Sequence, residues 1–220
     1  MTAIAAASSG RIYRQAADFL STLDDDWARH IAATGPCGHQ PKPAREPYEA
    51  LVRAIAYQQL HAKAGDATLG RLLALYPGSG FPTPEQLLTA DEAALRGCGF
   101  SARKLAAIRG IAQATLDGIV PNRDDALSMP DEALIDRLVS LRGVGRWTVE
   151  MLLIYSLART DVLPGDDFGV RDGYRRLKRL AAAPPRKQIL EISQAWRPYR
   201  TIATWYLWRV PAAQAASQIP

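Results

Sequence analysis

The chain has 220 residues, of which 48% are hydrophobic, a formal net charge of +5 and a sequence pI of about 9.4. This length can bury a sizeable core, as one domain or as two small lobes. No apolar run approaches the roughly 18 residues of a membrane span, and residues 1–10 lack the basic start of a signal peptide. The two cysteines, Cys37 and Cys98, give no disulfide framework. We therefore expect a cytoplasmic protein that binds no membrane.

Apolar residues recur at helical spacing along most of the chain, and no alternating run of useful length indicates a strand. The sequence therefore predicts an all-α protein. The expected helices span 12–33, 46–59, 62–75, 102–116, 131–141, 146–158, 168–180 and 187–208, the last broken at Pro198. Stretches rich in proline and glycine at 35–47, 77–84 and 120–130 are expected linkers, and residues 1–11 and 212–220 are expected frayed ends.

A Gly-x-Gly turn, Gly143-Val144-Gly145, separates two of these helices. We expect both glycines to permit a sharp turn with exposed N–H groups, which a side chain at either position would strain or block. The N-terminus of the following helix, near Arg146, favours an anion. Such a hairpin can hold a DNA phosphate without reading sequence. The plain alternative is a tight connection between two helices.

Two carboxylates, Asp166 and Asp167, follow a Pro-Gly break and start the next expected helix. They lie about two dozen residues after the hairpin. A phosphate-binding turn and one fixed negative charge at this separation indicate an enzyme that works on DNA.

The string L-R-G-V-G-R-W-T at 141–148 resembles the helix-hairpin-helix of the base-excision DNA glycosylases, with Arg142 in place of the usual proline. The segment L-P-G-D-D-F-G-V-R-D-G at 163–173 resembles the Gly/Pro…Asp element of the same superfamily. The G-R-W-T form, together with residues 81–108 and 196–208, resembles the 3-methyladenine DNA glycosylase II (AlkA-type) family, so the match covers roughly 45–210.

The resemblance implies a single domain, 1–220, of two helical lobes with the active site in the cleft between them. Lobe one would take about 50–130, and lobe two would combine 12–45 with 131–210. Only about 45 residues precede Glu46, and they read as a helix and a linker, so we expect the short form without an N-terminal β-domain.

The resemblance also implies the residues of the base pocket. Asp167 matches the catalytic aspartate, and Asp166 is expected to cap the helix or brace the loop. The expected walls are Trp147, Phe168 and Trp208, whose faces can stack on a flipped base. Met151 and Phe168 stand where the family has tyrosines, so the pocket is less polar. Each aromatic taken alone could equally be a core residue.

The remaining DNA contacts are expected in two places. Gln59 best matches the wedge inserted into the DNA stack, with Leu60 beside it and His61 reaching the minor groove. The alternative makes Leu60 core and Gln58 a cap. The expected phosphate contacts are Gly143, Gly145, Arg146 and Thr148.

The resemblance constrains cofactors and lyase activity. Trp147 stands where lyase-competent relatives carry a Schiff-base lysine. Two cysteines cannot hold a four-cysteine iron–sulfur cluster, and Cys37-Gly38-His39 lacks the second pair that a zinc site needs. We expect no cofactor other than a monovalent cation, held by the carbonyls of Val139, Leu141 and Gly143, as the resemblance implies.

We therefore expect a monofunctional DNA glycosylase, a monomer, that removes alkylated purines, chiefly 3-methyladenine and 7-methylguanine, from double-stranded DNA. In a bacterium it would be nucleoid-associated. Two alternatives remain: a glycosylase for a neutral lesion such as uracil, hypoxanthine or an oxidised purine, or a non-catalytic helix-hairpin-helix DNA-binding module.

Two further features are ambiguous. Leu95-Arg96-Gly97-Cys98-Gly99 repeats the pattern of the hairpin and is either a second backbone site on DNA or an ordinary helix–helix turn. Residues 171–209 carry ten Lys and Arg against two acids, Asp172 and Glu191. This basic region suits a polyanion, or it is a solvated helix face. Its basic residues are Arg171, Arg175, Arg176, Lys178, Arg179, Arg186, Lys187, Arg197, Arg200 and Arg209.

Overall fold

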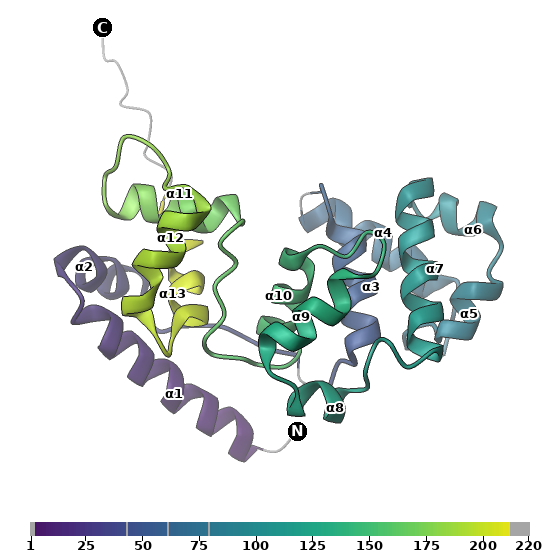
Figure 1. The fold of residues 1–220 in the computed structure, drawn as a ribbon, viewed down its shortest axis with the longest axis horizontal. Coiled ribbons are helices and arrows are strands. Elements are labelled where there is room, and N and C mark those ends of the chain that lie inside the picture. Colours follow the sequence, from purple (N-terminus) through teal and green to yellow (C-terminus); the bar gives the residue numbers. More distant parts are fainter. Residues whose placement is uncertain (1–2, 43, 61, 79, 212–220) are drawn as a thin grey trace, which may run out of the picture. The chain divides into compact units, whose positions relative to one another are not determined.

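The computed structural model describes residues 3–42, 44–60, 62–78 and 80–211. Within these ranges every regular element is a helix, which confirms the expected fold class (Figure 1). None of these helices is long and apolar enough to cross a membrane. The helices are α1 (Ala3–Ser21), α2 (Asp25–Thr34), α3 (Pro47–Tyr57), α4 (Ala62–Ala74), α5 (Pro84–Thr89), α6 (Glu92–Gly97), α7 (Ala102–Leu116), α8 (Arg123–Ser128), α9 (Asp131–Val139), α10 (Arg146–Tyr155), α11 (Phe168–Leu177), α12 (Arg186–Ile192), the 3₁₀ helix η1 (Ser193–Trp196) and α13 (Arg200–Leu207).

The N-terminal segment forms two helices instead of the one expected over 12–33. The side chain of Asp24 accepts the N–H groups of Asp26 and Trp27, so it caps α2 and ends the preceding helix a few residues earlier. The expectation of a frayed end was wrong for residues 3–11, because α1 begins at Ala3.

A short helix lies within one of the three expected linkers, and another begins at the end of a second. α5 starts at Pro84 with a capping box between Thr83 and Gln86. α8 lies within 120–130, capped by the side chain of Asn122. The polar and proline residues that we interpreted as loop signals therefore act as helix starts. The expected break at Pro198 is confirmed, because α13 begins at Arg200.

The chain divides into two compact units, the central unit (residues 41–158) and the terminal unit (residues 1–40 with 159–220). This boundary differs from the expected lobes, which put 131–158 with the C-terminal helices. The reason is packing: α10 contacts α3 as well as α9, so the hairpin belongs to the central unit.

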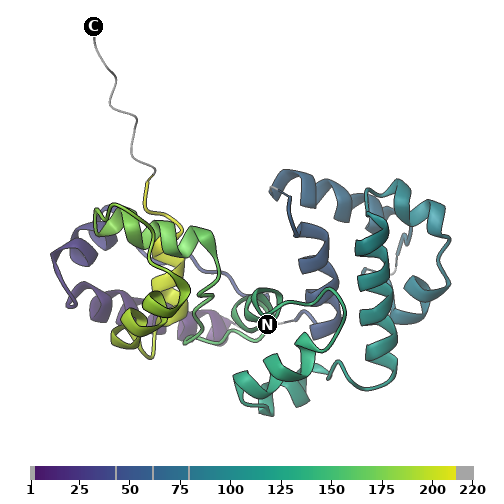
Figure 2. The ribbon, with the colours of Figure 1, turned by 45° about the horizontal axis from the view of Figure 1, so that its top comes forward.

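The central unit is organised around α7, α3 and α10. Two views show α7 beside α5, and α7 also packs on α3 (Figures 1 and 2). Leu51 and Ile55 of α3 are fully buried, as is Ile108 of α7. This packing holds the start of α10 at a fixed place beside the end of α3.

The terminal unit packs α11 against α13, with α1 and α2 beside α13. Its core contains two fully buried tryptophans, Trp27 and Trp196, whose rings meet edge to face at 5.5 Å between centroids. Tyr206 of α13 is also fully buried and donates its hydroxyl to the carbonyl of Gly35. This core fixes α13, whose C-terminal end carries Trp208.

Candidate active site

The expected hairpin is present between α9 and α10. The turn bonds run from Leu141 N–H to the Leu138 carbonyl and from Val144 N–H to the Leu141 carbonyl. Gly143 has φ of +86°, and a Cβ there would lie 2.8 Å from the Cβ of Ala107 on α7. Gly143 therefore has to be glycine, both for its backbone angle and for the close approach to α7.

Gly145 has no such requirement, which corrects the expectation that both glycines need to lack a side chain. Its φ of −94° and ψ of 167° are those of extended backbone, and a Cβ there would meet nothing within 4 Å. Gly145 is the N-cap of α10 and supplies no capping side chain. It leaves the N-terminus of α10 without a capping side chain, and a helix N-terminus favours an anion.

Of the side chains expected on the phosphate, Arg146 is held by two carboxylates. Its guanidinium donates two bonds to Glu132, at 2.9 and 2.5 Å, and one of 3.0 Å to Glu150. Hydrogen bonding by Glu132 raises the pKa of Arg146 above its usual value. Thr148 is only 2% exposed, so its hydroxyl is buried away from the surface. Arg146 is thus engaged by carboxylates and Thr148 is buried, which leaves the backbone of the turn as the remaining candidate for a phosphate contact.

The residue that holds the hairpin to α3 is Gln58, which sequence reasoning considered only as a cap. Its side-chain amide donates to the Gly143 carbonyl at 3.1 Å and to the Thr148 hydroxyl at 3.3 Å. The only signal in the sequence was its place directly before the expected wedge. Gln58 fixes that loop against the turn.

The expected wedge residues lie exposed beyond Gln58. Gln59 has a left-handed backbone, with φ of +58°, a strained angle for a residue with a side chain. Leu60 is 40% exposed, so the alternative that made it core is wrong. His61 lies outside the described residues. An open cavity of about 750 Å³ separates this loop from the hairpin, and Arg103 and Trp147 also line it.

The two carboxylates of the terminal unit have different partners. Asp167 is the N-cap of α11, and its Oδ1 accepts the Val170 N–H at 2.9 Å. The same oxygen accepts the indole N–H of Trp208 at 3.1 Å. Asp166 is exposed and pairs with Arg186 at 3.1 Å. The cap expected at Asp166 is therefore made by Asp167, and Asp166 braces the loop.

The expected aromatic walls divide between the two units. Trp147 and Met151 lie half-buried on α10 in the central unit. Phe168 and Trp208 lie in the terminal unit beside Asp167. Phe168 is 68% exposed, which is unusual for a phenylalanine and argues against a core role. The structure brings Asp167 and Trp208 into contact.

More than half of the cations in the basic region form ion pairs, although Asp172 and Asp161 each serve two arginines. Six of its ten cations pair with carboxylates: Arg175, Arg176, Lys178, Arg186, Arg197 and Arg200. Arg209 lies over the ring of Trp205, 3.6 Å from the centroid. Counting charges along the sequence therefore overstated the positive surface, and the interpretation as a solvated helix face gains support.

The repeat at 95–99 forms an ordinary connection between α6 and α7. Gly99 has φ of +101°, and Ser101 caps α7 by accepting the Lys104 N–H. Arg71 covers the turn by donating to the Cys98 carbonyl at 2.9 Å. These bonds give the motif a structural role.

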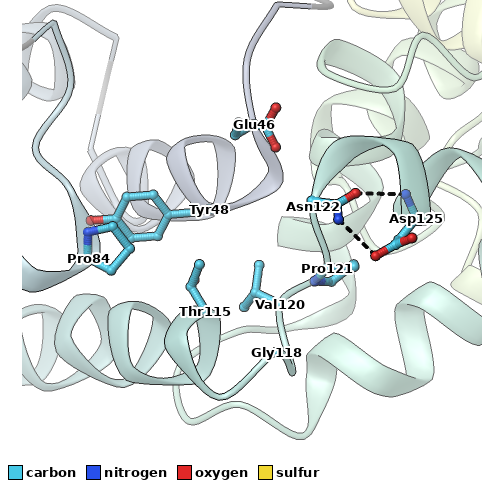
Figure 3. A pocket seen from close by; sticks show the side chains of 9 residues that line it. All are labelled: Glu46, Tyr48, Pro84, Thr115, Gly118, Val120, Pro121, Asn122 and Asp125. Atoms are coloured by element: carbon cyan, nitrogen blue, oxygen red, sulfur yellow. Dashed lines mark hydrogen bonds between the residues drawn. The ribbon is translucent and has the colours of Figure 1, made fainter.

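Another cavity of the central unit, of about 420 Å³, contains Glu46 and Asp125 (Figure 3). Glu46 accepts the backbone N–H of Arg123, and Asp125 accepts the side-chain amide of Asn122. Both carboxylates thus stabilise the start of α8. Among the described residues, no group of three or more His, Cys, Asp or Glu could hold a metal ion.

Comparison with known proteins places these features in a family. A family model described as HhH-GPD superfamily base excision DNA repair protein matches residues 52–198. DNA-3-methyladenine glycosylase 1 of Schizosaccharomyces pombe is 45% identical over 193 residues, which cover 86% of this chain and 84% of that protein. The alkylbase DNA glycosidase-like protein mag2 of the same organism is 33% identical over 207 residues, 94% of this chain and 97% of that protein.

Solved structures give the same result. The fold is similar to that of S. pombe 3-methyladenine DNA glycosylase (Mag1) in complex with abasic DNA, with a TM-score of 0.83 and 45% identity over 88% of this chain and 95% of that chain. A DNA-3-methyladenine glycosidase of Bacillus halodurans aligns with a TM-score of 0.75 and 31% identity, over 88% and 87% of the two chains.

Proposed function

Because the chain belongs to the HhH-GPD superfamily of base excision DNA repair proteins, we propose that it is a monofunctional DNA glycosylase that removes alkylated purines, chiefly 3-methyladenine and 7-methylguanine, from double-stranded DNA. The observation that carries the proposal is Asp167, held at the N-terminus of α11 beside Trp208 and the exposed Phe168. We propose further that the protein acts as a monomer.

The reaction needs the base outside the duplex, which costs a few kcal/mol. Gln59 and Leu60, exposed on their loop, are the proposed wedge that fills the gap. The backbone of the hairpin is the proposed phosphate contact, which positions the DNA without reading its sequence. Aromatic faces then hold the base, and stacking is worth ~1–3 kcal/mol per base.

Hydrolysis breaks the bond between C1′ and the base nitrogen, and water adds its oxygen to C1′. The sugar passes through an oxocarbenium-like state, whose positive charge the carboxylate of Asp167 would stabilise. The same carboxylate can orient the water and take its proton. An alkylated purine already carries positive charge, so it leaves as a neutral base without a general acid.

Trp147 supports the monofunctional assignment, because an indole cannot form the Schiff base on which a lyase depends. The carbonyls of Val139, Leu141 and Gly143 are the proposed ligands of a monovalent cation, which would offset the charge of the bound phosphate. Leu141 and Gly143 each accept one hydrogen bond already. A carbonyl oxygen has two lone pairs, so these bonds are compatible with a cation.

The test is release of bases from defined duplexes, identified by mass. We expect 3-methyladenine and 7-methylguanine to be released from methylated DNA, and Asp167→Asn to abolish release while DNA binding stays nearly intact. Asp166→Asn is the matched control and should lose much less. Release of uracil, hypoxanthine or an oxidised purine in preference to methylated bases would overturn the substrate assignment. Full single-turnover activity of Asp167→Asn would overturn the role of Asp167.

A further inference from the structure

Two glycines allow α11 and α13 to approach closely within the terminal unit. A Cβ on Gly173 would lie 2.2 Å from the Leu207 carbonyl oxygen, so the two backbones meet there. A Cβ on Gly169, one turn earlier, would lie 3.0 Å from Asp167 Oδ1 and 3.1 Å from Trp208 Cδ1. Gly169 therefore sits directly against the contact between the carboxylate and the indole.

The contact itself joins the ends of two helices. Trp208 is the C-cap of α13, and its backbone N–H donates to the Thr204 carbonyl at 3.1 Å. Its indole N–H then reaches Asp167 Oδ1, which also accepts the Val170 N–H. One carboxylate oxygen is thus held by a donor from each helix, which fixes the rotation of the carboxylate about its side-chain bonds.

We propose that Trp208 is a positioning residue for Asp167, acting through its indole N–H rather than only through its ring face. The inference rests on the proposed glycosylase function. Stacking on a base needs any large aromatic ring, whereas an indole N–H adds a donor that cannot accept. A donor to an ionised oxygen makes a stronger bond than a neutral pair. Gly169 is part of the arrangement, because a Cβ there would crowd both groups and at least one of them would have to shift.

The sharpest variant replaces the indole N–H by sulfur. Trp208→β-(3-benzothienyl)alanine, introduced by nonsense suppression, keeps the size and aromatic face of the ring and removes the donor. Trp208→Phe also removes the donor, but it leaves a smaller, single aromatic ring. We expect the single-turnover rate of 7-methylguanine release to fall roughly 10- to 100-fold, the effect of losing one hydrogen bond to a charged group.

Binding distinguishes positioning from stacking. The probe is a duplex carrying 2′-fluoro-7-methyldeoxyguanosine, whose glycosidic bond resists hydrolysis. We expect the benzothienyl variant to bind it within about threefold of wild type, because the ring face remains. Unchanged release by the benzothienyl variant, or a loss confined to binding, would overturn the proposal and leave Trp208 as a wall of the pocket.

A second variant changes Gly169, which lies against the same contact. Gly169→Ala should slow release to a similar degree, and it should add little to the loss already caused by Trp208→Phe, since both act on one contact. Gly110→Ala on α7 is the matched control, because a Cβ there meets nothing within 4 Å. Fully additive losses would overturn the shared mechanism.

A spectroscopic measurement keeps this inference separate from the proposed function. The indole N–H resonance of Trp208, identified by its absence in Trp208→Phe, should move in Asp167→Asn whether or not any base is released. A protein that releases no base but shows this coupling would refute the glycosylase assignment and retain the contact. A resonance that does not move would refute the contact itself.

Discussion

The same substitution placed two residues apart provides the strongest test of the hairpin. Gly143→Ser and Gly145→Ser add an identical side chain to the two glycines of one turn. A reading of the sequence alone gives both glycines the same purpose. The structure predicts opposite effects on the free energy of unfolding, because the two backbones and their surroundings differ.

At Gly143 the change should be costly. The φ of +86° is a left-handed angle that costs an L-residue about 1–2 kcal/mol. The Cβ would lie 2.8 Å from the Cβ of Ala107, and such overpacking costs about 1–3 kcal/mol. Loss of glycine's freedom in the unfolded chain returns about 0.4–1 kcal/mol. We expect a net loss of roughly 1–4.5 kcal/mol.

At Gly145 the same change should increase the free energy of unfolding. The φ of −94° and ψ of 167° suit any residue, and the new Cβ meets nothing within 4 Å. Gly145 is the N-cap of α10, where serine is a little better than glycine, by a few tenths of a kcal/mol. Adding the effect on the unfolded chain, we expect a gain of roughly 0.5–1 kcal/mol.

The assay is urea unfolding followed by helical circular dichroism, with the two variants and wild type in parallel. Gly118→Ser gives a calibration, since Gly118 has φ of +73° but an open surrounding, so it reports the cost of the backbone angle alone. If the two hairpin variants differ by less than about 0.5 kcal/mol, the left-handed turn and the close approach to α7 are both refuted.

Four further outcomes are expected. Gly145→Asp should weaken binding to damaged and undamaged duplexes alike, by roughly 1–3 kcal/mol for a like charge about 6 Å from a phosphate. Gly145→Asn, the uncharged control, should bind nearly as well as wild type. Equal binding by the two variants in a filter assay would show that the hairpin only connects two helices. Gln58→Leu should cost roughly 1–3 kcal/mol in urea unfolding, for two lost hydrogen bonds, and an unchanged midpoint would show that Gln58 does not fix the turn. Trp147→Lys should leave the abasic strand intact and give no borohydride-trapped adduct with DNA; wild type that traps strongly would refute the monofunctional assignment. Burial acts to raise the pKa of Asp24, but hydrogen bonding by Lys178 lowers it below its ordinary 3.8. The ion pair therefore stabilises the fold above pH 3.8, and this contribution is lost as the pH falls further. Lys178→Gln should make the melting temperature depend less on acid pH, and an unaltered profile in thermal melts would contradict the pairing.

The helical class and the long helices could be predicted because their apolar faces repeat at 3.6 residues. The short helices could not. α5 and α8 have six residues each, too few for a periodic face to register, and their starts lie among prolines and polar residues. The division into units also escaped prediction, because it depends on α10 packing against α3, a contact between residues far apart in the sequence.

For the candidate site, the residue types allowed the main elements to be located, but the hydrogen-bond partners could not be predicted. The hairpin and the Asp166-Asp167 pair could be located from the sequence, yet which aspartate caps α11 is set by backbone geometry at one residue. The link from Gln58 to the hairpin joins residues 85 apart. The excess of cations at 171–209 was real, but partners such as Asp24 and Asp161 lie outside that segment, so counting within it missed them.

The N-termini of two helices, α10 and α11, have different proposed roles in this chain. Both α10 and α11 begin with N–H groups that favour negative charge. The N-cap of α10, Gly145, has no side chain, so under the proposed function the helix amides bind the DNA phosphate. The N-cap of α11 is Asp167, whose own carboxylate accepts the Val170 N–H and so carries the negative charge at a fixed position. Exchanging the two caps should therefore remove both phosphate binding and stabilisation of the sugar. Gly145→Asp places a carboxylate where the DNA phosphate should bind. Asp167→Gly leaves a helix N-terminus that attracts an anion but has no charge to stabilise the sugar. The second variant should bind DNA at least as well as wild type and release no base, and weakened binding would show that the carboxylate of Asp167 contributes to holding the DNA.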